Sequence, residues 1–272
     1  MIKSMYSGVS GLRAHQAKMD VVGNNIANVN TAGYKASRIT FSDVFSQTNA
    51  TASAPSDDGS IGGINPQQIG LGVTVNSIDL DFNAGSPQDT GRTLDVALSG
   101  DGFFAVMDPN GEILYTRLGA FEKDGGENGG NLVISGTGHF VLDSEGQKIN
   151  VSGYTNIQID QKGNVLGLDD ANDVQTIATI QVANFINPGG LEKTGGSMYK
   201  ATQNSGEPLA DDDLVAGNNG TGLLSPGYIE LSNVDLAREF TELIVTQRGY
   251  QANSRVITTS DTLLEELINL KR

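Results

Sequence analysis

The amino-terminal end of the chain carries apolar side chains at alternating intervals of three and four residues. This spacing is typical of the narrow apolar stripe of a coiled-coil helix, whereas a helix that packs on a globular core has a wider stripe. The helical pattern ends near Asn28, in the Asn- and Gly-rich segment 23–35. We therefore predict one long amino-terminal helix with a seam formed by Ile2, Met5, Val9, Leu12, Met19 and Ile26.

The carboxy-terminal end continues this spacing from residue 234 to residue 270. Gly249 is the one poor helix former in that stretch, which would make a helix of roughly 55 Å. Because long helices with narrow seams favour other helices as partners, we predict that the two ends pair as a coiled coil. The second seam consists of Leu236, Phe240, Leu243, Tyr250, Ile257, Leu264 and Ile268.

The middle of the chain follows a period of two residues, in short apolar or alternating runs separated by Gly-containing turns. One turn unit occurs three times, as DPNG at 108–111, DSEG at 143–146 and DQKG at 160–163. An Asp that accepts backbone N–H bonds and a Gly at positive φ are typical of tight hairpin turns. The pattern therefore predicts an α+β protein, with long terminal helices and a β-rich central domain built of hairpins. The expected strands lie within 73–80, 94–98, 103–107, 113–117, 131–134, 140–142, 157–159 and 177–185.

Composition divides the chain in the same way. Residues 41–230 contain 30 of the 35 Gly and all 7 Pro. Residues 46–68 are small, polar and interrupted by Gly and Pro, which is typical of a linker or loosely held loop. We therefore expect an amino-terminal core segment with an extended linker at 1–70, a β-rich outer domain at 71–230 and a carboxy-terminal core segment at 231–272.

Charge makes nucleic acid a poor partner. The chain has 17 Lys and Arg against 32 Asp and Glu, a net charge of −15, whereas nucleic-acid binding depends on neutralising phosphates. Residues 41–230 carry 7 basic and 25 acidic side chains, so the negative charge is concentrated in the middle. The longest apolar runs are too short for membrane insertion, and the first residues lack the apolar core of a cleaved signal peptide.

Catalytic and metal-binding motifs are few. The chain has no Cys, and its two histidines, His15 and His139, are far apart in sequence. Residues 100–105 fit the GxGxxA dinucleotide fingerprint, but the next predicted element is a strand, so no helix amino terminus would face a pyrophosphate. The acidic runs at 169–170 and 211–213 are expected to be solvated. We therefore predict no cofactor, no metal site and no enzymatic activity. A soluble enzyme and a β-rich adhesin are the alternatives, but neither accounts for the terminal seams.

Residues 4–35 resemble the amino-terminal signature of the bacterial flagellar rod and hook proteins, a helix followed by NNIAN-x-NT-x-G-(Phe/Tyr)-Lys. Residues 232–272 resemble the carboxy-terminal helix of that family, with SNVDL and QRGYQANS, and residues 91–106 are similar to its central block. The signature positions are Asn24, Asn25, Ile26, Asn28, Asn30, Thr31, Gly33, Tyr34 and Lys35.

This resemblance implies an extracellular axial polymer of the flagellum, exported through the type III apparatus, with terminal helices inside and β domains outside. The motifs SNVDL, TTSD and INLKR favour the hook protein, a flexible, torque-transmitting joint between rod and filament, with the distal rod protein as the alternative. The implied partners are other copies of the chain, flagellar rod and hook–filament junction proteins, the hook cap and the export apparatus.

Overall fold

The computed structural model describes residues 2–55, 62–125, 130–169, 173–209, 214–218 and 220–270. The chain forms two compact units. The first unit contains both terminal segments and residues 37–79, and the second contains residues 27–36 and 80–234.

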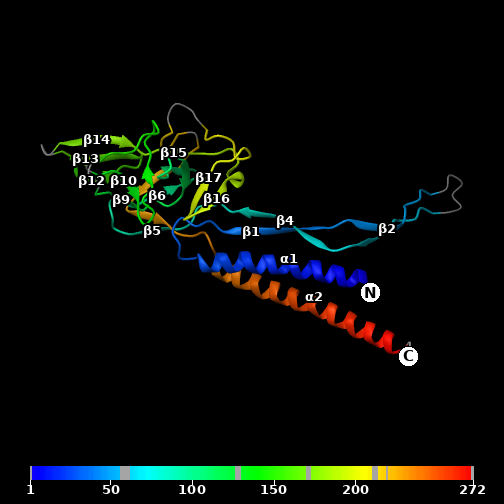
Figure 1. Cartoon of the computed structure of the whole chain (residues 1–272). Helices are drawn as coiled ribbons and strands as arrows, with labels where there is room; N and C mark the ends of the chain where they lie inside the picture. Colours follow the sequence, from blue (N-terminus) through cyan, green and yellow to red (C-terminus); the bar gives the residue numbers. More distant parts are fainter. Residues whose placement is uncertain are drawn as a thin grey trace. The chain divides into compact units, whose positions relative to one another are not determined.

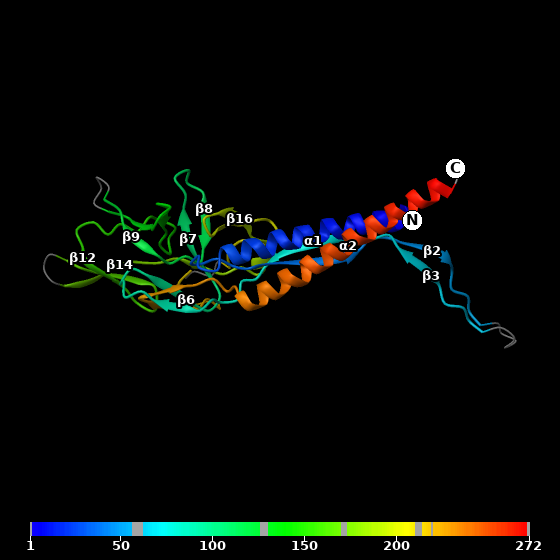
Figure 2. The ribbon, with the colours of Figure 1, turned by 90° about the horizontal axis from the view of Figure 1, so that it is seen from below.

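The first unit contains the two long helices that the seam spacing predicts. These are α1 (Ile2–Ala27) and α2 (Leu236–Leu270), drawn in blue and in orange to red in Figure 1 and seen from below in Figure 2. The Asp235 carboxylate caps α2, because its Oδ1 accepts a hydrogen bond of 2.9 Å from the Ala237 N–H. Strand β1 (Ser37–Asp43) pairs with β4 (Val73–Leu80) in the same unit.

A second pair of strands lies in the segment that the sequence predicts to be a linker. Strand β2 (Ser46–Ala50) pairs antiparallel with β3 (Gln67–Gly70), and Ser53 and Ile64 form a further bridge beyond them. The sequence predicts a linker or loosely held loop here, and the pairing of β2 with β3 was not predicted. Ladder hydrogen bonds join backbone groups whatever the side chains are, so small polar residues can form a ribbon without an apolar face.

The second unit is β-rich, as predicted. Its main sheet has the antiparallel order β16 (Glu192–Gly195), β17 (Met198–Lys200), β8 (Ile113–Thr116), β7 (Phe103–Met107), β11 (Phe140–Val141), β10 (Leu132–Ile134) and β9 (Phe121–Lys123), and β15 (Val182–Ala183) also pairs with β7. The smaller sheets are β12 (Thr155–Ile159)–β13 (Asn164–Leu168)–β14 (Val174–Thr179), β18 (Leu223–Pro226)–β6 (Val96–Ser99) and β19 (Tyr228–Glu230)–β5 (Pro87–Asp89), and η1 (Pro188–Gly190) is a short 3₁₀ helix.

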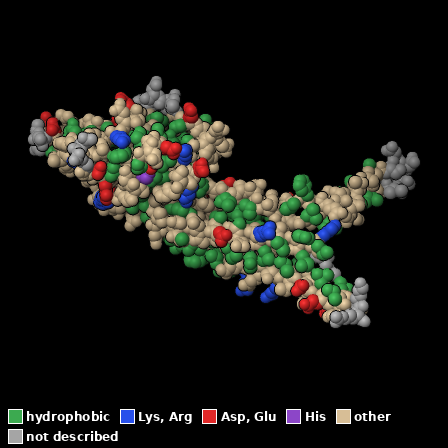
Figure 3. Space-filling view, viewed as in Figure 1, with side chains coloured by type: hydrophobic (Ala, Val, Ile, Leu, Met, Phe, Trp, Pro, Cys, Tyr) green, Lys and Arg blue, Asp and Glu red, His purple; other side chains and the backbone are tan. Residues whose placement is uncertain are grey.

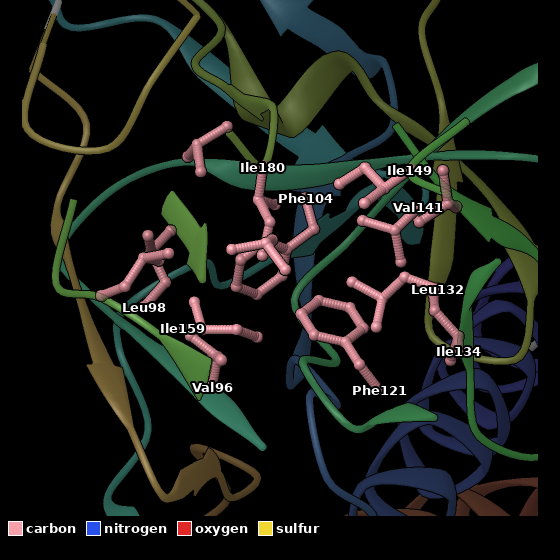
Figure 4. Close-up of a cluster of buried hydrophobic side chains, with 14 of the residues drawn as sticks. Val96, Leu98, Phe104, Phe121, Leu132, Ile134, Val141, Ile149, Ile159 and Ile180 are labelled. Carbon is pink, nitrogen blue, oxygen red and sulfur yellow. The ribbon is translucent and has the colours of Figure 1, made fainter. Parts of the chain in front are cut away.

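The core of this unit lies on both faces of β7. Phe104 and Val106 point into the larger apolar cluster, whereas Phe103 and Ala105 point into a second one. The larger cluster joins strands of the main sheet to β6, β12 and β13. Figure 4 shows the side chains that β6 and β12 contribute beside those of the main sheet. A strand that is buried on both faces has a nearly continuous apolar sequence, which explains the run FFAVM at 103–107.

The repeated turns have the predicted geometry. In each turn the Gly N–H donates to the carbonyl of the Asp three residues before it, over 2.7–3.0 Å. The three glycines, Gly111, Gly146 and Gly163, have φ between +76° and +85°. The repeat is therefore a structural device that closes hairpins.

Candidate functional site

Within the first unit, α1 and α2 contact each other and run in opposite directions (Figures 1 and 2). Near the start of α1, a Cβ atom at Gly8 would lie 3.3 Å from Ile257 Cγ1. Further along, Lys18 Nζ lies 3.2 Å from Glu242 Oε2. As residue numbers rise along α1 they fall along α2, so the pair is antiparallel.

We use the name contact stripe for the glycines, and for the residues that meet them or form ion pairs or hydrogen bonds, at the contact between the two helices. Most of its members are small or polar, and on α1 they follow intervals of three, four and seven residues. The contact stripe consists of Gly8, Gly11, His15, Lys18 and Asn25 on α1, and Glu239, Glu242, Gly249, Asn253 and Ile257 on α2.

The predicted seam positions flank this stripe. Val9, Leu12, Met19 and Ile26 each follow a contact residue by one position, which is a rotation of about 100° around the helix. On α2 the same offset holds for Phe240, Leu243 and Tyr250, and Ile257 belongs to both stripes. Hydrophobic side chains are visible along the part of the molecule that holds α1 and α2 (Figure 3).

The seam is therefore incompletely buried in a single chain. The side chains of Ile2, Phe240 and Ile268 are 65%, 51% and 67% exposed. Val9, Leu236 and Tyr250 are also exposed. The remaining seam residues are partly buried, namely Met5, Leu12, Met19, Ile26, Leu243, Ile257 and Leu264.

Asn25 of the signature joins the end of α1 to strand β1. Its Nδ2 donates to the Ser37 carbonyl over 2.8 Å, and its Oδ1 accepts from the Ser37 N–H over 3.0 Å. Asn25 also hydrogen-bonds Glu239 of α2; burial raises the pKa of Glu239, and this bond opposes the rise. A buried Asn at this position therefore links three elements of the first unit. Its neighbour Asn24 is exposed, and Ile26 is partly buried.

The rest of the signature belongs to the second unit and begins with a turn. The Thr31 N–H donates to the Asn28 carbonyl over 3.1 Å, and the Thr31 hydroxyl donates to Asn28 Oδ1 over 3.2 Å. Asn30 is exposed. Gly33 has φ of +67°, and a Cβ there would lie 2.9 Å from the Leu118 backbone nitrogen. Positive φ and this close approach together require glycine.

Tyr34 and Lys35, the last signature residues, are both buried. Lys193 Nζ lies 4.2 Å from the centre of the Tyr34 ring, in a cation–π contact. Lys35 Nζ donates to Glu230 Oε1 over 2.7 Å and to the Asn83 carbonyl over 2.8 Å. Burial lowers the pKa of Lys35, and the carboxylate of Glu230 opposes this shift.

Glu230 also faces a second buried cation. Arg117 Nη1 lies 3.5 Å from Glu230 Oε2 and donates to the Gly100 carbonyl over 2.7 Å. The Gly85 N–H donates to Glu230 Oε1 over 2.7 Å. A buried charge is stable when it is paired and hydrogen-bonded. Oε1 of Glu230 is paired and hydrogen-bonded, and Oε2 is paired with Arg117.

Asn233 connects the same three parts of the chain. Its Oδ1 accepts from the Ala36 N–H over 2.8 Å, and its Nδ2 donates to the carbonyls of Asp81 and Asn83 over 2.8 and 3.2 Å. Residues 33–36, 81–85 and 230–233 therefore meet in what we call the three-segment junction. The motifs at 23–35 and 232–236 mark two of these segments, but nothing in the sequence singled out Glu230 or Arg117.

The described residues include no group of three or more His, Cys, Asp or Glu that could hold a metal ion. Asp170 and Asp211–Asp213, for which the sequence predicts no site, lie outside the described residues. The fingerprint-like segment at 100–105 leads into strand β7, as predicted. In the described part of the chain, no helix has both the length and the apolar content needed to span a membrane.

Three family descriptions match the chain. "Flagella basal body rod protein" matches residues 5–35, which include most of α1 and the signature. "Flagellar hook protein FlgE/F/G D1 domain" matches residues 97–167, and "Flagellar basal body rod FlgEFG protein C-terminal" matches residues 225–270. The matched regions include most of α1, all of α2, Glu230, Arg117 and all the signature residues.

Full-length relatives agree with these matches. The chain is 46% identical over 273 residues to the flagellar basal-body rod protein FlgG of Bacillus subtilis, and the match covers 100% of each protein. It is 38% identical to FlgG of Buchnera aphidicola from Schizaphis graminum, covering 99% of this chain and 100% of the relative. The hook protein FlgE of Borreliella burgdorferi is 29% identical over 447 aligned positions, with full coverage of both. The chain therefore belongs to the bacterial flagellar rod and hook protein family, whose members are structural parts of the flagellum.

Proposed function

We propose that this chain is a self-assembling subunit of the distal rod of the flagellar basal body. The observation that carries this choice is the length and identity of its relatives. Rod proteins named FlgG align over their whole length in 273 and 274 positions, whereas the alignment with a hook protein needs 447 positions for a chain of 272 residues. The rod assignment replaces the hook expectation from the sequence. SNVDL, TTSD and INLKR lie in or beside α2, the helix that rod and hook proteins share, so they discriminate weakly.

Assembly is proposed to use the seams of α1 and α2. These apolar side chains flank the contact stripe and remain partly exposed in one chain, and burying them against other copies would remove apolar surface from water. Such packing would give the seams the helical partners that their spacing favours. Repeated contacts between different faces of identical subunits produce an open helical polymer when they do not close into a ring.

The partners proposed for this function are other copies of the chain and the neighbouring rod proteins, after delivery through the export apparatus. Hook–filament junction proteins and the hook cap belong to the hook alternative. Nucleic acid is not proposed, because the net charge of −15 repels phosphates.

Deleting the gene for this chain distinguishes a distal rod protein from a hook protein. We expect basal bodies isolated from the deletion strain to end in a truncated rod when viewed by electron microscopy. A plasmid copy of the gene should restore the full rod, and a copy with the Leu243→Asp substitution should not. Basal bodies with complete rods and outer rings but no hook would contradict the rod proposal and would identify the hook protein instead.

A further inference from the structure

Two pairs of residues across the helix contact have the same reciprocal arrangement. A Cβ atom at Gly11 of α1 would lie 2.8–3.0 Å from the carboxamide atoms of Asn253 on α2. A Cβ atom at Gly249 of α2 would lie 2.7–2.8 Å from Cε1 and Nε2 of His15 on α1. Each helix therefore places one polar side chain directly on a glycine of the other helix.

These glycines do not stabilise the helices in which they lie, because glycine is less favourable than alanine inside a helix. Gly23 shows the contrast within α1, since a Cβ atom there would meet nothing within 4 Å. At Gly11 and Gly249, the missing side chain leaves the space that Asn253 and His15 occupy. Asn253 is also held on its own helix, because its Nδ2 donates to the Gly249 carbonyl over 3.1 Å.

The arrangement fits one register of the two helices. If α1 slid by one turn, about 5 Å, in one direction, His15 and Asn253 would meet each other in the contact stripe. In the opposite direction, Gly11 would face Gly249 and leave a gap, and His15 would face the turn of α2 that contains Thr246. Either shift loses both close contacts.

We propose that the pairs Gly11–Asn253 and His15–Gly249 determine the register and the partner specificity of the α1–α2 contact. The segment that α1 accepts must carry an asparagine and a glycine one turn apart, in antiparallel orientation, which in this chain is residues 249–253. The ion pair between Lys18 and Glu242 and the bond between Asn25 and Glu239 then extend the same register along the helices. This inference concerns pairing within one chain and does not depend on whether the protein belongs to the rod or to the hook.

Distance measurements in the full chain test the proposal. The chain has no cysteine, so Asp20→Cys and Asp261→Cys introduce two nitroxide labels at exposed positions on α1 and α2. The two labels are offset along the helix axis by about 25 Å, so a slide of one helix past the other changes the distance between them. Double electron–electron resonance, with labelled chain diluted into unlabelled chain, should give one narrow distance distribution. Gly11→Ala and Gly249→Ala should each shift this distance by about one turn, about 5 Å, or spread it broadly. Gly23→Ala, the matched control on the same helix, should leave the distance unchanged and raise the helical circular dichroism signal.

A rescue variant keeps the test decisive if Gly11→Ala disorders the helices. Asn253→Ala removes the carboxamide that the added methyl group would strike, so the double variant Gly11→Ala/Asn253→Ala should recover a narrower distribution than Gly11→Ala alone. If Gly11→Ala behaves like Gly23→Ala, the proposal is wrong. The same conclusion follows if Asn253→Ala gives no rescue while Gly23→Ala retains the original distance.

Discussion

Lys35 and Glu230 are 195 residues apart in the chain, yet their charged groups meet at 2.7 Å with almost no exposure to solvent. Each charge would be expensive to bury alone, and the pair is stable because backbone groups and Arg117 supply further partners. At the residue scale, the signature residue Lys35 therefore holds three segments of the second unit together through its bonds to Glu230 and Asn83.

Breaking this pair on one side should be strongly destabilising. We expect Lys35→Met to lower the free energy of unfolding by about 3 kcal/mol, because Glu230 would keep a buried charge with Arg117 as its remaining cation. Urea unfolding followed by near-ultraviolet circular dichroism measures the loss. Lys162→Met, at an exposed turn position, is the control and should change stability little. If Lys35→Met lowers the free energy of unfolding by less than about 1 kcal/mol, the buried ion pair does not have this stabilising role.

The buried residues Tyr115 and Tyr199 predict that the second unit loses stability at alkaline pH. Burial raises the pKa of Tyr115 and, more strongly, that of Tyr199, for which Tyr34 adds to the shift and Arg117 opposes it. Because the folded pKa exceeds the unfolded value of about 10, the folded state retains protons that the unfolded state loses. The associated stability is present below about pH 10 and is lost as the pH rises above it.

Ultraviolet absorbance of the phenolate can follow this titration. Of the seven tyrosines, Tyr115 and Tyr199 should ionise only together with loss of the near-ultraviolet circular dichroism signal. In the Tyr199→Phe variant, the rise in phenolate absorbance that accompanies unfolding should be smaller by one tyrosine. Ionisation of all seven tyrosines while the fold remains intact would contradict this expectation.

At the element scale, each terminal helix has two adjacent stripes with different chemistry. The contact stripe is mostly small or polar and joins α1 to α2, whereas the seam is apolar and partly exposed. A single helix can therefore pack against the other helix of its own chain through one stripe and, as proposed, against a neighbouring subunit in the polymer through the other.

A charge in the seam should prevent assembly. Leu243→Asp should abolish polymer formation, because an unpaired carboxylate buried between subunits would cost several kcal/mol. Electron microscopy of concentrated protein detects the polymer, and circular dichroism of the β-rich unit checks that folding is unaffected. Gln251→Asp adds the same charge at an exposed position of α2 and should still assemble. Normal polymers from Leu243→Asp would mean that the seam is wrongly assigned.

At the scale of the whole molecule, the two compact units do not follow the chain order. The second unit takes residues 27–36 from the amino-terminal region, including Gly33 and Lys35, in addition to residues 80–234. The outer domain expected at 71–230 thus lacks part of the three-segment junction, and its independent folding stays a prediction.

A comparison of two fragments tests this organisation. We expect fragment 71–230 to be soluble and unable to polymerise, because it lacks both helices. It should be less stable to urea than fragment 27–234, because only the longer fragment contains Lys35 and Asn233. Equal stability of the two fragments would count against a role for residues 27–36, and fibres formed by the shorter fragment would contradict assembly through the helices.

Local patterns in the sequence determined the two helices, the repeated turns and part of the strands of this protein. The intervals of three and four residues predicted α1 and α2 within one or two residues, and the Asp–Gly units predicted three turns, because both signals depend on neighbours along the chain. The family motifs also marked Asn25, Gly33 and Lys35 before their contacts were known. The ribbon of β2 and β3 was missed because its strands are held mainly by backbone hydrogen bonds and carry no apolar period.

The tertiary structure alone decided which of these residues meet. Glu230 and Arg117 look like ordinary charged residues in the sequence. Glu230 becomes the buried partner of both Lys35 and Arg117 only when distant segments of the chain converge. The contact stripe that joins α1 to α2 likewise could not be predicted from the sequence, because its glycines and polar residues do not form an apolar periodic pattern. Close packing of backbones depends on the absence of side chains, which becomes informative only when the opposing helix is in place.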